Sequence, residues 1–184
     1  MDILEGVLDE FKKLAAIPRA NGHEQAVSDF LKKYLTDAGF SVVQDAKNNI
    51  IADKPATKGY ENAPRTILQG HMDMVAVGEE GYDYDPLKDP IKLVRTDKYL
   101  EAEGTSLGAD DGIGVAEGIY LMKNAKDHGP LRLIVTTDEE RGMTGAIALD
   151  AKHLTDAQFL INCDSENYDE LTVGSAGGID LSFE

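Results

Sequence analysis

The chain contains a single cysteine, no tryptophan and about half as many basic as acidic residues. Cys163 has no partner for an internal disulfide, which predicts a reducing compartment, most simply the cytoplasm. Because it ends an apolar stretch, we expect it to be a small core residue rather than a nucleophile. The N-terminal residues MDILEGVLDEFKK lack the features of a secretory signal, and no apolar run approaches the length of a membrane span.

Basic residues are too few to balance the acidic ones. The 18 Lys and Arg residues face 34 Asp and Glu residues, which gives a formal net charge of -16. A protein with this charge repels nucleic acid and anionic membrane surfaces, so we expect neither as a partner. Small molecules and cations remain as possible ligands. The length of 184 residues, with 42% hydrophobic and 28% charged residues, predicts one globular domain with a core of its own.

The apolar pattern alternates between helical and strand spacing. It predicts helices from residue 3 to Pro18 and over 26–35, 112–125 and 143–152, and strands over 40–43, 49–53, 66–70, 131–137 and 159–163. The polar stretch 78–98 contains prolines and is predicted to be a long loop. The alternation predicts an α/β fold with a largely parallel sheet, in which the last two strands are buried.

Acidic residues follow the predicted strands or apolar runs at four places. They are His71 with Asp73, Asp110 with Asp111, the run Asp138, Glu139 and Glu140, and Asp164 with Glu166. Open α/β sheets build their sites at the carboxyl ends of strands, where these groups would meet. Carboxylates gathered in one place repel one another unless a cation lies among them. The pattern therefore favours a metal-dependent hydrolase.

Each cluster also has a structural interpretation. Asp110 and Asp111 precede a predicted helix and could cap its N-terminus. The acidic run at 138–140 could be a solvated turn, and the pair at Asp164 is equally open. His71 could be a buried structural histidine, although an acid two residues further on is the arrangement that orients a metal-bound imidazole.

Together the clusters favour a metal site more strongly than each does alone, because we expect them to meet at one sheet edge. One histidine with several carboxylates and no cluster of thiolates suits Zn²⁺, Mn²⁺ or Co²⁺. Two such ions bridged by one carboxylate would activate water and polarise a carbonyl, which is the chemistry of peptide or amide hydrolysis. Adjacent Glu139 and Glu140 could divide the roles of general base and metal ligand.

The motifs of the chain, taken in order, resemble a known family. The strings HMDMV, EGTSLGADDGIG, TTDEERGMTGA, INCDSE and AGGIDLSF are similar to those of the dinuclear zinc metallopeptidases that include aminoacylase, carboxypeptidase G and peptidase T. Within that family the chain most resembles the aminoacyl-histidine dipeptidases, also called peptidase D or cytosol non-specific dipeptidases. The resemblance implies a three-layer α/β sandwich, with a mixed, largely parallel sheet between helices, and hydrolysis of small peptides.

The resemblance also implies a role for each site residue. It makes His71 and Asp164 ligands of one ion, Asp110 the bridging carboxylate, Glu140 a ligand of the second ion, Glu139 the general base and Asp73 the acid that orients His71. It further implies a cis peptide bond between Asp110 and Asp111, with Asp111 turned away from the ions and capping the next helix. The two ions are expected to be zinc, with cobalt or manganese as alternatives.

One ligand of the family has no counterpart here. The family takes a further histidine for its second ion from late in the chain, after an inserted lid and dimerisation domain. We expect residues 1–184 to be the N-terminal part of the catalytic domain, inactive alone and with an uncovered apolar sheet edge or face, most exposed at AGGIDLSFE. His23, His128 and His153 are expected at the surface. The full-length enzyme could be a homodimer.

Three functional alternatives stay open. A dinuclear dipeptidase is the main expectation. An aminopeptidase or an N-acyl amino acid deacylase of the same family would use the same ions on a different substrate. A truncated domain that binds metal without catalysis is the third, because the histidine of the second ion is missing.

Overall fold

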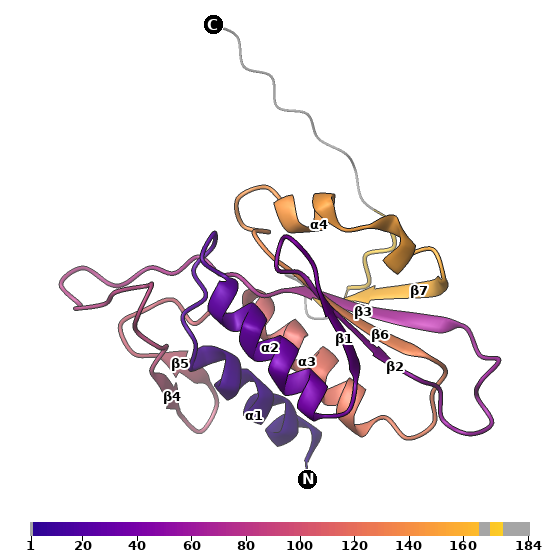
Figure 1. Cartoon of the computed structure of the whole chain (residues 1–184). Helices are drawn as coiled ribbons and strands as arrows, with labels where there is room; N and C mark the ends of the chain where they lie inside the picture. Colours follow the sequence, from indigo (N-terminus) through magenta and orange to yellow (C-terminus); the bar gives the residue numbers. More distant parts are fainter. Residues whose placement is uncertain (1, 166–169, 175–184) are drawn as a thin grey trace, which may run out of the picture.

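The computed structural model describes residues 2–165 and 170–174, and it is built around a five-stranded sheet (Figure 1). The strands lie in the order β1-β2-β6-β3-β7. Their bounds are β1 Ser41–Gln44, β2 Ile50–Lys54, β3 Arg65–His71, β6 Leu131–Thr136 and β7 Ala157–Asn162. Strands β6, β3 and β7 are parallel, whereas β1 and β2 run antiparallel to their neighbours. The predicted mixed α/β sheet is confirmed.

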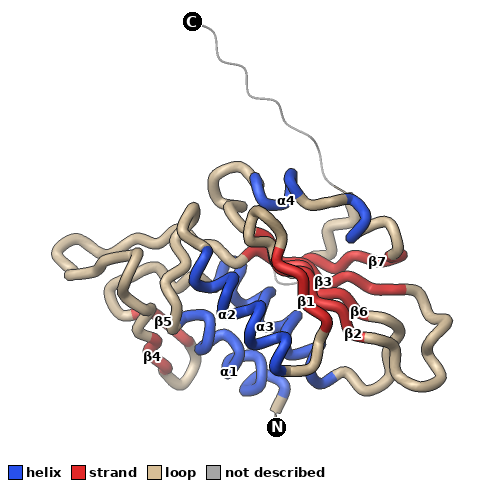
Figure 2. Tube along the Cα trace, in the orientation of Figure 1, coloured by secondary structure: helices blue, strands red, loops and turns tan. Residues whose placement is uncertain are grey.

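Three helices cover one face of the sheet, and short helical turns lie over the other (Figures 1 and 2). The first layer consists of α1 (Ile3–Ala15), α2 (Gln25–Asp37) and α3 (Ala109–Asn124). Apolar residues spaced three or four apart, such as Phe11, Leu14, Leu31 and Leu35, turn inward and are almost fully buried. The opposite face carries α4 (Thr144–Ala148) and a 3-10 turn at Ala151–His153.

Two predicted elements differ from the structure. The stretch predicted as a loop over 78–98 contains β4 (Leu93–Arg95), which pairs antiparallel with β5 (Leu100–Ala102). Strands of three residues are too short to produce a clear alternating pattern. The helix predicted over 143–152 ends at Ala148, because Leu149 is extended and Asp150 begins a new turn by accepting a hydrogen bond from the Lys152 backbone N–H.

Strand β7 is exposed, which corrects the prediction of a second buried strand. Phe159, Leu160 and Ile161 are each about half exposed, at 52%, 52% and 50%. The strand lies at the edge of the sheet and pairs with β3 alone among the described elements. An uncovered apolar sheet edge was expected, and β7 provides one. Residues 176–184, expected to be most exposed, lie outside the described residues, as does Glu166.

The positions of Cys163 and His128 also correct the sequence analysis. Cys163 is exposed because it follows the edge strand. Partial desolvation and the nearby Glu117 carboxylate raise the pKa of its thiol to about 11, so the reactive thiolate is scarce. His128 is buried rather than exposed: its backbone N–H donates to Thr57 Oγ1, and its Nδ1 lies 2.7 Å from the Gly129 carbonyl oxygen. His23 is exposed and His153 is half-buried.

Within the part of the chain that the structure describes, no helix combines the length and the apolar character needed to cross a membrane.

Candidate metal centre

The carboxyl ends of the three parallel strands bring the predicted site residues together. In the register of the sheet, His71 at the end of β3 pairs with Thr136 at the end of β6, and Gln69 pairs with Asn162 near the end of β7. The residues that follow β6 and β7 therefore lie on either side of His71. Asp110 comes from the turn into α3, which packs against β3. This edge is where open α/β sheets place their ligands.

His71 is buried and is held from one side. Its Nδ1 lies 3.1 Å from the backbone oxygen of Asp73 and 3.4 Å from the Oδ1 atom of the same residue. These acceptors hold the proton on Nδ1, so when Nε2 loses its own proton to a competing metal ion its lone pair becomes the ligand atom. Nε2 lies 3.0 Å from Asp110 Oδ1 and 3.8 Å from Asp164 Oδ2. The ring thus presents a ligand atom to two carboxylates.

Three of these side chains form a group that could hold a metal ion. One ligand atom each from His71, Asp110 and Asp164 lies within 4.8 Å of the other two. An imidazole nitrogen with two carboxylate oxygens is a donor set for zinc, manganese or cobalt. The chemistry of the residues present therefore fits a divalent ion at this position.

Asp73 connects the histidine to the acidic turn after β6. Its side chain is fully buried, and its two carboxylate oxygens accept the backbone N–H groups of Glu139 at 3.1 Å and Glu140 at 3.2 Å. Burial alone would raise the pKa of Asp73, but the hydrogen bonds from His71 and from these two N–H groups hold it below its usual value. Asp73 is therefore a charged, fixed anchor for both His71 and the turn.

The acidic run itself divides into different environments. Asp138 accepts hydrogen bonds from Arg141 Nε at 2.8 Å and from Thr144 Oγ1 at 2.5 Å, so it stabilises the turn. Glu139 Oε2 lies 4.0 Å from His71 Nε2, and Glu139 lines a cavity of about 290 Å³ together with Asp164. Burial and the charge of Asp164 raise the pKa of Glu139. The structural interpretation of the run thus holds for Asp138.

Glu140 lies beside the three-residue group without belonging to it, as judged over the described residues. Burial and the charge of Asp110 raise the pKa of its carboxyl group. The contact that places Glu140 at the site is its backbone N–H, which donates to Asp73 Oδ2. The structure therefore brings His71, Asp73, Asp110, Glu139 and Asp164 together and attaches Glu140 to them through its main chain.

The Asp110–Asp111 pair separates into one exposed and one buried carboxylate. The peptide bond between them is cis, as predicted. The Asp110 side chain is 71% exposed, whereas Asp111 is buried and its Oδ2 accepts the His71 backbone N–H at 3.1 Å. Burial raises the pKa of Asp111 to about 7. Asp111 lies apart from the three-residue group, with its carboxylate bonded to the end of β3. The start of α3 is kinked at Asp110 and Asp111, and the capping role of Asp111 stays a prediction.

Sequence reasoning missed two buried residues beneath this edge. Asn49 accepts the Thr137 backbone N–H at 3.1 Å and donates to the Gly145 carbonyl at 2.9 Å, which fixes the segment after β6. Arg19 donates to backbone carbonyls around the site. Asparagine and arginine side chains are mostly exposed in proteins, so exposure was the default expectation for both residues.

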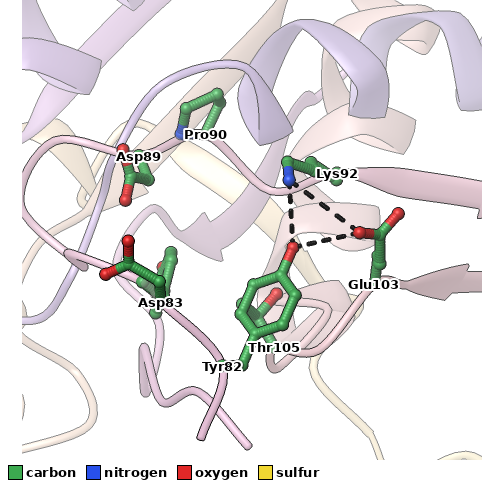
Figure 3. Close-up of a pocket in the computed structure, with 8 residues that line it drawn as sticks. Tyr82, Asp83, Asp89, Pro90, Lys92, Glu103 and Thr105 are labelled. Atoms are coloured by element: carbon green, nitrogen blue, oxygen red, sulfur yellow. Dashed lines mark hydrogen bonds and ion pairs between the residues drawn. The ribbon is translucent and has the colours of Figure 1, made fainter.

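A second group of acids lies apart from the strand ends, in the segment that contains β4 and β5 (Figure 3). It lines a cavity of about 260 Å³ that none of the predicted site residues borders. Here Lys92 Nζ lies 3.1 Å from the Tyr82 hydroxyl and 3.8 Å from Glu103 Oε1, and Figure 3 shows the three side chains converging. The Lys92 ammonium group, a cation of the protein itself, therefore lies among these side chains.

Comparison with known proteins agrees with the geometry. Residues 67–178 match the model of peptidase family M20/M25/M40. The chain is 39% identical to the cytosol non-specific dipeptidase of Escherichia coli (strain K12), over 95% of this chain and 36% of that protein. It is 28% identical to a succinyl-diaminopimelate desuccinylase of a Nitratiruptor species, over 97% of this chain and 48% of that protein.

Among solved structures, the aminoacylhistidine dipeptidase of Vibrio alginolyticus superposes with a TM-score of 0.83 and 39% identity, over 88% of this chain and 33% of that one. The chain thus spans between a third and a half of the length of these relatives. The site residues, from His71 to Asp164, all fall within the matched region. The chain belongs to peptidase family M20/M25/M40.

Proposed function

We propose that the protein is a metal-dependent hydrolase of dipeptides, acting on aminoacyl-histidine or on a broader range of unblocked dipeptides. The observation that carries the proposal is the convergence of His71, Asp110 and Asp164, with the Glu139 carboxylate beside them. Relatives named as dipeptidases, at 39% identity, support the substrate class. The name of the E. coli relative and the single cysteine support a cytoplasmic location.

The same proposal includes two divalent ions, with zinc as the preferred metal and cobalt or manganese as substitutes. His71 and Asp164 would hold one ion, Glu140 the other, and Asp110 would bridge them. The Asp110 side chain is 71% exposed, which suits a bridging ligand, and the attachment of the Glu140 backbone to Asp73 supports the second position. When bound, the ions would supply Lewis acidity that lowers the pKa of water and polarises the scissile carbonyl.

In this mechanism Glu139 is the general base. Its partly buried carboxylate takes a proton from the attacking water and passes the proton to the nitrogen of the leaving amine. A pKa raised by burial and by the charge of Asp164 makes Glu139 a better proton acceptor than an exposed glutamate. Asp73 keeps His71 in the tautomer that can bind metal, and it holds the backbone of Glu139 and Glu140 in place.

We further propose that residues 1–184 form the N-terminal part of the catalytic domain. A further ligand of the second ion, the lid and the surfaces that bind substrate would come from chain beyond these residues. The half-exposed apolar side chains of β7 support this view, because a packed domain normally covers such an edge. The proposal predicts that the 184-residue chain alone is inactive.

The test is a substrate comparison on the zinc-loaded, full-length protein. Unblocked dipeptides, including aminoacyl-histidine, are expected to be hydrolysed faster than N-succinyl and other N-acyl amino acids. The desuccinylase relatives favour deacylation as a second candidate, and faster hydrolysis of the N-acyl substrates would establish it instead. Stoichiometric zinc binding with no hydrolysis of either class would leave a metal-binding domain without catalysis.

A further inference from the structure

Arg19 is a buried arginine in the turn between α1 and α2, directly beneath the candidate metal centre. The residue is 2% exposed and is among the largest fully buried side chains of the described chain. Its backbone runs beside the segment that follows β3: the Met74 N–H donates to the Arg19 oxygen at 3.1 Å, and the Asn21 N–H donates to the Met74 oxygen at 3.2 Å. The turn is therefore attached to the site through main chain as well as side chain.

The guanidinium group joins the two segments that carry the facing ligands. Nη1 donates to the carbonyl oxygens of Met72 at 3.0 Å and Asp73 at 3.3 Å, just after His71. Nη2 donates to the carbonyl oxygen of Gly108, two residues before Asp110. The Asp73 oxygen is also the atom that lies 3.1 Å from His71 Nδ1. One rigid planar group thus sets the distance between the end of β3 and the turn into α3.

The glycines of this turn leave the space that the guanidinium occupies. A methyl group on Gly112 would lie 2.6 Å from Arg19 Nη2, and one on Gly108 would lie 2.5 Å from the same atom. Gly108 also has a φ of +67°, a conformation that favours glycine. The sequence on both sides of Asp110 and Asp111 is therefore shaped around Arg19.

The charge of Arg19 matches its surroundings. Burial lowers its pKa to about 10, while the charges of Asp73 and Asp111 act in the opposite direction, so the side chain stays cationic at neutral pH. It is a fixed positive charge below a group of carboxylates. Its two Nη groups donate to three backbone carbonyls, so an uncharged side chain at this position would leave those buried acceptors without their partner.

We propose that Arg19 is a positioning residue of the metal centre: by bonding the carbonyls of Met72, Asp73 and Gly108, it fixes His71 and Asp110 face to face before a metal ion binds. This inference rests on the proposed function, because it assigns Arg19 to the same site. Arg19 contacts no ligand atom in this role. It acts through the backbone on which the ligands stand.

The experiment measures zinc affinity of the full-length protein by competition with a chromophoric chelator, together with the visible spectrum of the Co²⁺-loaded protein. Arg19→Met is expected to weaken zinc binding by roughly 10- to 100-fold, the usual effect of losing a group that orients metal ligands. The Co²⁺ spectrum is expected to change, because it reports the ligand geometry. Arg19→Lys should recover only part of the loss, since an ammonium group cannot reproduce the planar fork.

Arg132 provides the matched control. It is also buried, and it also donates to a backbone carbonyl, that of His153, and to two aspartates, but at the opposite end of the sheet. Arg132→Met is expected to lower the melting temperature while zinc affinity and the Co²⁺ spectrum stay unchanged. This separates loss of stability from loss of ligand placement.

The outcomes distinguish this inference from the proposed function. A folded Arg19→Met protein with wild-type zinc affinity and an unchanged Co²⁺ spectrum would overturn the role of Arg19 alone. A wild-type protein that binds no divalent ion would overturn both. If Arg19→Met does not fold, the same measurements are made on Arg19→Lys and Gly112→Ala, because each variant keeps a positive charge in the turn. Wild-type zinc affinity and an unchanged Co²⁺ spectrum in both variants would again overturn the inference.

Discussion

The two ends of the sheet both collect acids, but they neutralise them differently. At the end where the parallel strands begin, Arg132 lies 2.9 Å from Asp53 and 2.7 Å from Asp156, and Arg65 lies 2.8 Å from Asp53. The charges of two arginines and two aspartates therefore balance at this end of the sheet. Although burial acts against it, the hydrogen bond from Arg132 keeps the pKa of Asp156 below its usual value.

At the end where the same strands finish, the acids outnumber the cations of the protein. Arg19 and His71 are positive groups that act on the cluster, and the pKa values of Glu139, Glu140 and Asp111 are all raised, in each case chiefly by burial. An arginine for each aspartate makes a structural network. An excess of partly buried carboxylates around one histidine instead makes a place for a cation from outside.

The largest effect is expected at Glu139. In the full-length enzyme, Glu139→Gln should lower kcat by roughly 10²- to 10⁴-fold while metal content stays near that of the wild type, because an amide cannot accept the proton of water. Glu140→Gln should instead lower metal content. Rate measurements and metal analysis of both variants check this division, and equal metal loss in both variants with no change in intrinsic rate would contradict it.

The next effect concerns metal binding at the two ends of the sheet. His71→Ala should weaken the tight zinc site by more than about 100-fold, because loss of a ligand exceeds the loss of a residue that orients one. Arg132→Met should leave zinc affinity unchanged and cost about 1–3 kcal/mol of stability, since partners at the other end lose their hydrogen bonds. Equilibrium dialysis and thermal unfolding measure the two quantities. Unchanged zinc binding in His71→Ala would contradict the assignment of His71 as a metal ligand.

A smaller effect is expected at Asp73. Asp73→Asn keeps the shape of the side chain but removes its charge, so it should weaken zinc binding by roughly 10- to 100-fold. Asp156→Asn is the matched variant at the other end of the sheet, and it should not alter zinc affinity. Competition assays with a chelator provide the comparison, and equal losses in the two variants would show that the effect is not specific to the site.

The smallest effect, taken per pH unit, is a dependence of zinc affinity on pH. Burial lowers the pKa of His71, but the hydrogen bond to Asp73 and the charges of Asp73 and Asp111 outweigh it and raise this pKa to about 9 without metal. The ring is then cationic at neutral pH and must lose a proton to bind zinc. Affinity should rise about tenfold per pH unit up to pH 9 for each proton displaced. Calorimetry in buffers of different ionisation enthalpy counts these protons, and a count of zero would contradict the prediction.

Much of the candidate site could be predicted because its signals are local. His71 ends a recognisable strand, Asp73 follows it, and Asp164 follows the strand that lies beside it in the sheet. What could not be predicted depends on contacts distant in sequence. Arg19 is 89 residues from the Gly108 carbonyl that it binds, and no pattern near residue 19 distinguishes it from a surface arginine.

The errors have the same physical origin. Strand β7 has the apolar composition of a buried strand, but burial depends on what packs against it, and the described residues leave it half exposed. The predicted burial of Cys163 is wrong for the same reason, because this residue follows β7. His128 was assigned to the surface from its loop, yet Thr57 and its surroundings enclose it. Composition predicts which residues can be buried, and only the arrangement of layers decides which are.

The sequence by itself determined the alternation of helices and strands, the mixed α/β fold and the identity of the acids and the histidine at the strand ends. It did so because side-chain periodicity and turn chemistry act over a few residues. The tertiary structure alone decided that Asp110 faces the cluster while Asp111 turns under β3, and that Arg19 lies beneath them. These choices depend on hydrogen bonds between segments far apart in the chain, whose partners become neighbours only when the sheet and its helices have packed.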